Sequence, residues 1–114
     1  MHEFSLAQSV LDIVTEVAQE NEIAAVDEVR LDIGQISGVS VEALEFAWSF
    51  LRDQQECTKT AALAIKRPEG HGRCRACGFN GRLTDYIRIC PACGSLELEI
   101  ISGEEFMVTG ISGE

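Results

Sequence analysis

Apolar residues recur at helical spacing in two segments of the chain. The first pattern follows Ser5, a candidate N-cap, and fades near Asn21. The second follows Ser40, another candidate cap, with Glu42 in the first turn, where a carboxylate suits the helix dipole. These patterns predict two amphipathic helices. The apolar positions that carry them are Leu6, Val10, Ile13, Val14 and Val17, then Val41, Leu44, Ala47, Trp48 and Leu51.

Alternating apolar and polar residues predict strands between and after the helices. Val29-Arg-Leu-Asp-Ile33 and Leu96-Glu-Leu-Glu-Ile100 both have the period of two that half-buried strands show. A short strand near residues 62–66 and a last one over about 106–111 complete the set. The order is α-β-α-β, a cysteine module, then β-β, which predicts an α+β fold with helices layered on a sheet. We expect the last strand to return to the first sheet.

Length and turn residues predict how the chain is divided. Its 114 residues suit one compact domain with a small satellite module. Pro68, Gly70 and Gly72 mark a boundary before the cysteines. We expect residues 1–68 and 105–114 to form one α+β domain and residues 69–104 to form an inserted module.

Charge is unevenly distributed around the net value of −10. Residues 1–58 carry −10, residues 59–93 carry +5, and residues 94–114 carry −5. An acidic body of this kind repels phosphate backbones, which disfavours nucleic-acid binding. No apolar run is long enough for a membrane span, and the N-terminus lacks the basic and apolar regions of a secretory signal. We therefore expect a cytoplasmic protein without membrane contact, whose thiols stay reduced.

Four of the five cysteines form a doubled motif. Cys74-Arg-Ala-Cys77-Gly and Cys90-Pro-Ala-Cys93-Gly are separated by twelve residues. Two residues between cysteines let a tight turn direct both sulfurs to one point, and two such turns give the tetrahedral thiolate set that Zn²⁺ prefers. All four positions are filled by thiolate, so we predict one structural zinc and no catalytic water. Iron would fit the same geometry, and a pair of redox disulfides is the other alternative.

The N-terminus holds a second candidate metal site. His2 follows the initiator Met1, and its imidazole, the terminal amine and neighbouring main-chain nitrogens could chelate one ion in small rings. A planar set of nitrogens suits Ni²⁺ or Cu²⁺ better than Zn²⁺. Glu3 could supply an oxygen ligand, or it could tune the site by contacting the ligands without binding the ion. His71 is a linker histidine or a further metal contact. Cys57 stands alone and is read as a small half-buried residue, because no His–Asn or His–Asp set is present to activate it as a catalytic thiol.

At these motifs the chain resembles the HypA/HybF family of hydrogenase nickel-incorporation proteins, over essentially its whole length. It departs from the pattern at Trp48, Phe106 and the last few residues. The segments that carry the resemblance are Met-His-Glu-x-Ser at 1–5, Val29-Arg-Leu-Asp-Ile-Gly34, Ser37-Gly-Val39, Glu42-Ala-Leu-x-Phe-Ala47, Cys90-Pro-x-Cys-Gly-Ser95 and Gly103-x-Glu-x-x-Val108.

The resemblance implies a metallochaperone, not an enzyme. It implies Ni²⁺ as the transported ion at Met1, His2 and Glu3, and structural Zn²⁺ at Cys74, Cys77, Cys90 and Cys93. It also implies two helices packed on a small mixed β-sheet with the zinc module inserted. The partners would be a nickel-handling GTPase and the [NiFe]-hydrogenase large-subunit precursor, with urease as a further client of some members. We expect a monomer or weak homodimer.

Two other functions are consistent with parts of the sequence. A zinc-ribbon module for nucleic acid or protein would use the arginines of the middle segment, but acidic flanks interrupt any basic stripe. A thiol oxidoreductase would use one C-x-x-C pair, and zinc ligation would quench it.

Overall fold

The computed structural model describes residues 2–84 and 88–114. They form two compact units: Met1–Leu31, Val39–Ile65 and Met107–Glu114 make the first, and Asp32–Gly38 with Lys66–Phe106 make the second. The predicted domain boundaries at 68/69 and 104/105 stay a prediction. None of the described helices combines the length and the apolar content that crossing a membrane requires.

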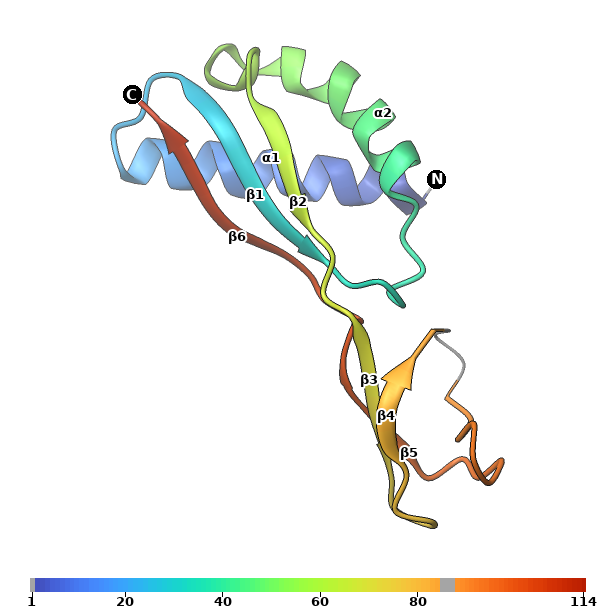
Figure 1. Ribbon diagram of the computed structural model, residues 1–114. Coiled ribbons are helices and arrows are strands. Elements are labelled where there is room, and N and C mark those ends of the chain that lie inside the picture. Colours follow the sequence, from blue (N-terminus) through green and yellow to red (C-terminus); the bar gives the residue numbers. More distant parts are fainter. Residues whose placement is uncertain (1, 85–87) are drawn as a thin grey trace. The chain divides into compact units, whose positions relative to one another are not determined.

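Two helices and one sheet build the first unit (Figure 1). Helix α1 spans His2–Glu20 and helix α2 spans Val41–Leu51, followed by the short 3-10 turns η1 (Arg52–Gln54) and η2 (Glu56–Thr58). The sheet has the order β2-β1-β6, with β1 at Val26–Ile33, β2 at Ala62–Lys66 and β6 at Phe106–Gly113. The predicted return of the last strand to the first sheet is confirmed.

Strand directions make this sheet mixed, as predicted. At the start of β1, the amides of Ala24 and Ala25 donate to the Glu114 carbonyl near the end of β6, so these two strands run antiparallel. After β1, the Gln35 amide donates to the Pro68 carbonyl just beyond β2, so β1 and β2 end at the same edge and run parallel. The α2 crossover between them is what a parallel pair requires.

The core of the first unit lies between the helices and one face of the sheet. Ala7 and Val10 of α1, Leu44 and Trp48 of α2, and Leu63 of β2 line one tightly packed apolar seam. The Trp48 indole Nε1 donates to the Ala61 carbonyl at 2.9 Å, which satisfies its one polar atom inside this seam. The other fully buried side chains here include Leu11, Val14, Ala18, Val26, Val29, Leu31, Ala47 and Leu51.

Helix α1 corrects the prediction at its start. Ser5 is not the N-cap: the helix begins at His2, and the Ser5 carbonyl accepts a bond from the Ser9 hydroxyl inside the helix. Glu3 then lies in the first turn, where its negative charge interacts favourably with the positive end of the helix dipole and stabilises the earlier start. Ile13, expected in the apolar stripe, is 45% exposed.

The second unit is built on an antiparallel sheet with the order β4-β3-β5. Strand β3 spans Gly70–Cys74, β4 spans Asn80–Leu83 and β5 spans Leu98–Ser102. Strands β3 and β4 have no apolar alternation and were not predicted. Strand β5 starts two residues later than the sequence indicates, because the Glu97 amide is held in a turn by the Ser95 hydroxyl.

The segment Asp32–Gly38 belongs to the second unit, although it lies between an expected strand and helix of the first. Ile36 from this segment is buried with Leu83 and Leu98 and with two of the cysteines, and Phe79 and Ile100 pack against the cluster. The Ile36 amide donates to the Gly103 carbonyl at 2.9 Å, and the Gly34 amide donates to the Glu105 carbonyl at 2.8 Å. These bonds join the segment to the residues that follow β5.

Candidate metal centres

Two matching turns bring the four cysteines of the doubled motif together. Their sulfur atoms all lie within 4.8 Å of one another, and the Cys74–Cys93 and Cys77–Cys90 sulfur pairs are each 3.7 Å apart. Four sulfurs at about 2.3 Å from one tetrahedral zinc ion lie about 3.8 Å apart. The cysteines are free, and the spacing is that of a thiolate metal site and far too long for disulfide bonds.

The two turns are built alike, which explains the repeated sequence. In the first, the Ala76 amide donates to the Cys74 sulfur at 3.3 Å, and in the second the Ala92 amide donates to the Cys90 sulfur at 3.4 Å. The glycines that follow each pair have φ values of 81° and 75°, in the left-handed region that glycine adopts without strain. Amide donation of this kind stabilises thiolate charge and fixes the direction of each sulfur.

The thiols share their protons unequally. At Cys90, burial is the largest single influence and raises the pKa. The amides of Cys93 and Ala92 and the thiols of Cys77 and Cys93 together outweigh burial and bring the pKa down to about 7. At Cys93 the Ser95 amide acts to lower the pKa, whereas burial and the three other thiols raise it to about 12. At Cys77 the Phe79 amide and the Cys93 thiol act to lower the pKa, but burial and the thiols of Cys90 and Cys74 outweigh them and raise it. A divalent cation at this position removes the mutual repulsion of four thiolates.

The arginines around the cysteines are engaged with carboxylates. Arg73 and Arg75 both reach Glu99, at 2.8 and 3.7 Å, and Arg88 contacts both oxygens of Glu104 at 3.0 and 2.8 Å. Arg82 lies 4.0 Å from Glu69 and donates to the Gln35 side chain. These pairs are exposed and individually weak. They nevertheless neutralise the arginines that a nucleic-acid module would need, so the geometry does not favour that function.

The N-terminal motif lies in the first turn of α1. Met1 lies outside the described residues, His2 is exposed and Glu3 is half-buried. Helix geometry leaves the amides of the first turn without intrahelical acceptors, so the main-chain nitrogens of residues 2 and 3 are free of helical hydrogen bonds. This is the condition that an ion held by main-chain nitrogens requires.

Glu3 is also joined to the second helix, a contact that no sequence pattern predicts. Its Oε2 accepts the Ser40 amide at 3.1 Å, while the Ser40 hydroxyl caps α2 by accepting the Ala43 amide at 3.2 Å. The Ser40 amide and then the Glu3 amide hold the pKa of this carboxyl below its usual range, with burial opposing and His2 adding a smaller decrease. The carboxylate therefore joins the first turn of α1 to the start of α2.

The two residues that the sequence left open are not among the grouped ligands of the cysteine site. His71 is in β3, with its Nε2 2.5 Å from the Asn80 side-chain oxygen, and it is not among the grouped ligands of the cysteine site. Cys57 is half-buried in η2 of the first unit and is a free thiol outside the cluster.

Comparison with known families agrees with this geometry. Residues 1–113 match the family model described as hydrogenase/urease nickel incorporation, metallochaperone, HypA. The chain belongs to the HypA family. HypA proteins are metallochaperones and not enzymes, which agrees with the expectation from the resemblance.

Curated relatives cover the whole chain. The hydrogenase maturation factor HypA of Chlorobaculum parvum is 39% identical over 118 aligned residues, with 100% of both chains covered. The factor of the same name from Geotalea uraniireducens is 40% identical over 115 residues, also with full coverage. Among solved structures, the nickel metallochaperone HypA of Helicobacter pylori has a TM-score of 0.72 at 21% identity, covering 97% of this chain and 96% of that one. That likeness shows a shared fold.

Proposed function

We propose that this chain binds Ni²⁺ through Met1, His2 and Glu3 and helps deliver it to the [NiFe]-hydrogenase large-subunit precursor. Membership of the HypA family supports nickel handling. The observation that carries the proposal is the placement of His2 and Glu3 in a helical turn whose amides have no intrahelical acceptors. An imidazole beside main-chain nitrogens that have no helical acceptors can form the planar nitrogen set that Ni²⁺ accepts. Exposure of His2 serves transfer, because a fully enclosed ion cannot be passed on.

The four cysteines hold structural Zn²⁺ in this proposal. A complete thiolate set leaves no position for water or substrate, so the ion stabilises the fold and performs no chemistry. Because the buried cluster of the second unit consists of three aliphatic side chains and two of the cysteines, metal binding and folding of this unit are coupled. Elemental analysis of protein purified without added metal tests the assignment. One zinc per chain is expected; iron would correct the metal, and absence of both would remove the site.

The partners proposed are the nickel-handling GTPase and the hydrogenase large-subunit precursor, with urease as a further client. We place the chain in the cytoplasm, where four reduced thiols are stable, and propose a monomer or weak homodimer, which analytical ultracentrifugation tests.

Calorimetric titration with Ni²⁺ tests the nickel site, using zinc-loaded protein with a native N-terminus. Tight binding by the natural chain and its loss in His2→Ala are expected. His71→Ala is the matched control, because it removes the only other histidine and should leave nickel binding unchanged. A residue added before Met1 should also weaken binding, since it converts the terminal amine to an amide. Equal binding by the natural chain and His2→Ala would exclude the N-terminal site.

A further inference from the structure

Helix α2 has a second ordered face, opposite the one that packs in the core. Leu44, Ala47, Trp48 and Leu51 are buried on the inner side. The exposed residues recur at intervals of three and four, so they form one continuous stripe along the helix and into η1. We name this stripe the outer face of α2; its members are Glu42, Glu45, Phe46, Ser49, Phe50 and Asp53.

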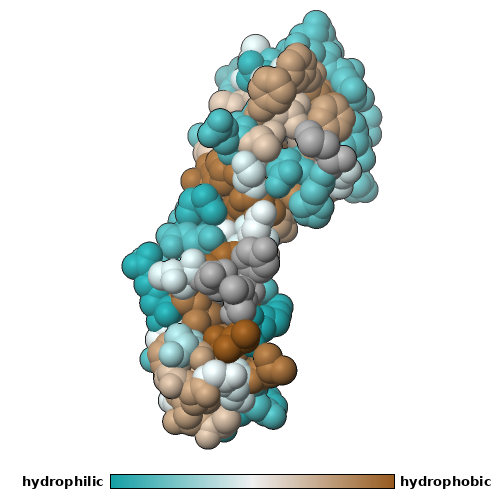
Figure 2. All heavy atoms as spheres, turned by 90° about the vertical axis from the view of Figure 1, so that its right-hand side faces the viewer, coloured by the Kyte–Doolittle hydropathy of each residue, from teal (hydrophilic) through white to brown (hydrophobic). Residues whose placement is uncertain are grey.

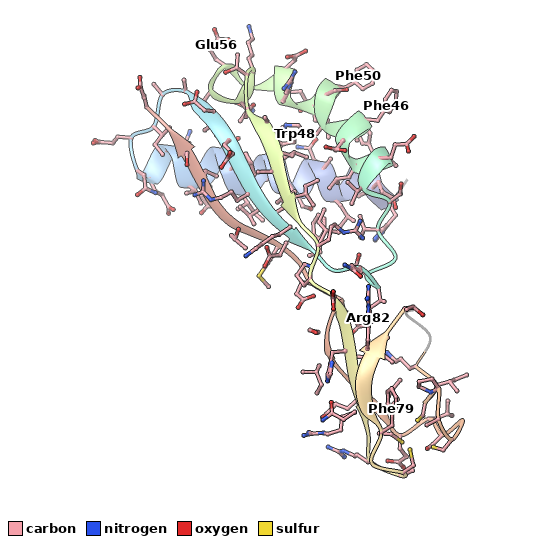
Figure 3. All side chains as sticks on the ribbon, viewed as in Figure 1. Phe46, Trp48, Phe50, Glu56, Phe79 and Arg82 are labelled. Atoms are coloured by element: carbon pink, nitrogen blue, oxygen red, sulfur yellow. The ribbon has the colours of Figure 1, made fainter. Side chains whose placement is uncertain are left out.

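Two aromatic rings stand at the centre of this outer face. Phe46 is 67% exposed and Phe50 is 59% exposed. Their ring centroids are 5.0 Å apart at an interplanar angle of 80°, so each ring orients the other edge to face. Figure 3 shows both side chains projecting away from the helix, and Figure 2 shows brown and tan side chains gathered among teal ones on this part of the surface. Paired, exposed aromatics rimmed by polar groups are typical of a protein-binding surface.

The charge of the outer face specifies what kind of partner fits it. Glu42, Glu45 and Asp53 flank the rings, and among residues 2–84 and 88–114 none of these carboxylates forms a salt bridge. Lys59, which pairs with Glu56, also interacts with the charge of Asp53, whereas no such interaction is seen for Glu42 and Glu45 among the described residues. A phenylalanine ring next to an unpaired carboxylate favours an arginine or lysine, which can stack on the ring and pair with the acid. The surrounding unit is strongly acidic as well, so it attracts a basic partner over a longer range.

A hollow borders the outer face. It lies between α2 and β2, has a volume of about 240 Å³, and includes Glu45 and Ser49 of the outer face. The Arg52 side chain at its edge donates to the Ala61 carbonyl, and Trp48 and Leu63 supply apolar lining. Small-molecule sites typically measure about 300–1,000 Å³. A hollow below that range, lined by charged and polar groups as well as apolar ones, fits one side chain of a larger partner better than it fits a cofactor.

We propose that the outer face of α2 binds a basic protein segment, which places one side chain in the hollow and sets arginine or lysine side chains over Phe46 and Phe50. This rests on the proposed function only in that a metallochaperone needs a partner-binding surface, and it does not involve the nickel ligands. The partner is defined by its chemistry: a cationic amphipathic segment.

A helical peptide without tryptophan, with leucines on one face and arginines beside them, serves as the probe, and its twin carries glutamates in place of arginines. Trp48 is the only tryptophan of the chain and lines the hollow, so its fluorescence reports binding directly. The cationic peptide should bind and its twin should not. Binding should weaken about tenfold in Phe46→Ser/Phe50→Ser, a change typical of removing central anchors.

Matched charge variants separate a specific site from general attraction. Glu42→Gln/Glu45→Gln/Asp53→Asn and the α1 set Asp12→Asn/Glu16→Gln/Glu20→Gln each remove three exposed carboxylates. Only the first set should weaken the peptide substantially, and added salt should weaken it further. Equal weakening by both sets, or no binding by the natural chain, overturns the proposal. The proposal is also overturned if the natural chain binds no peptide but forms a dimer that Phe46→Ser/Phe50→Ser abolishes. That result would assign the surface to a second copy of the chain. Nickel titration of the same variants should be unchanged, so failure of the nickel site would be seen independently.

Discussion

Replacing Gly34 by alanine should disrupt the second unit for a purely steric reason. A Cβ atom at this position would lie 1.9 Å from the Gly103 carbonyl oxygen and 2.7 Å from the Glu104 nitrogen. Gly34 is not among the residues with positive φ, so its own backbone angles would tolerate alanine. The neighbouring backbone must therefore move by about 1 Å to reach the shortest separation seen for real Cβ atoms.

That movement breaks identifiable bonds. The amides of Gly34 and Ile36 donate to the Glu105 and Gly103 carbonyls at 2.8 and 2.9 Å, and both bonds cross the gap that must open. A buried backbone group left unpaired costs about 1–3 kcal/mol, so losing two bonds costs about 4 kcal/mol. Gly38 is the matched control, because it has φ of 79° and no atom within 4 Å of a built Cβ. Gly38→Ala should cost only about 1–2 kcal/mol, from backbone conformation alone.

Urea unfolding of the two zinc-loaded variants measures the difference. With a typical urea dependence of about 2 kcal/mol per M, Gly34→Ala should lower the midpoint by about 2 M and Gly38→Ala by less than about 1 M. Because Ile36 packs against Cys74 and Cys90, Gly34→Ala should also release zinc faster to a chromogenic chelator. If Gly34→Ala were no more destabilising than Gly38→Ala, the close approach of these backbones would not hold in solution.

Three further predictions follow from titration and exposure. Zinc binding should release protons and weaken as the pH falls from about 8 to about 6, because the raised pKa of Cys93 keeps this thiol protonated without metal; calorimetry in buffers of different ionisation enthalpy counts the protons. The pKa of the Glu3 carboxyl is lowered in the folded protein. Its hydrogen bond from the Ser40 amide is therefore fully formed above the usual carboxyl pKa, and it is lost as the pH falls through the lowered pKa. The Ser40 amide signal in NMR should follow that titration, and Glu3→Gln should abolish the response. Phe46→Ser and Phe50→Ser should each lower the free energy of unfolding by about 1 kcal/mol or less, since more than half of each side chain is already exposed. A larger loss in urea unfolding would show that the rings support the core.

The sequence predicts best those features whose causes are local. The α2 cap at Ser40 is confirmed, because a capping side chain needs only the amide three residues ahead. Each C-x2-C-G segment forms its turn from its own residues, which is why the spacing predicts that the sulfurs face one point. The predicted start of α1 after Ser5 was wrong, because the helix begins at His2. Glu3 stabilises this earlier first turn, and its carboxylate accepts an amide 37 residues away.

Features that depend on pairing between distant backbone segments show no pattern in the local sequence. Strand β3 reads Gly-His-Gly-Arg-Cys and has no alternation of apolar residues. It is a strand because it lies between β4 and β5 and pairs with both. The same holds for Ile36, whose burial with the cysteines depends on the close approach of Gly34 to Gly103, a contact between segments almost 70 residues apart.

Helix α2 shows how sequence and structure together separate stability from recognition. Its sequence carries more large apolar residues than one helix face can bury, and the structure assigns Leu44 and Trp48 to the core and Phe46 and Phe50 to solvent. Removing Leu44 to alanine should cost about 2–5 kcal/mol, whereas the exposed rings contribute little to folding. Apolar area left in water adds almost nothing to the free energy of folding, so the paired rings of Phe46 and Phe50 are available for binding at little cost in stability. The carboxylates of Glu42 and Glu45, which form no salt bridge among the described residues, then favour a basic occupant.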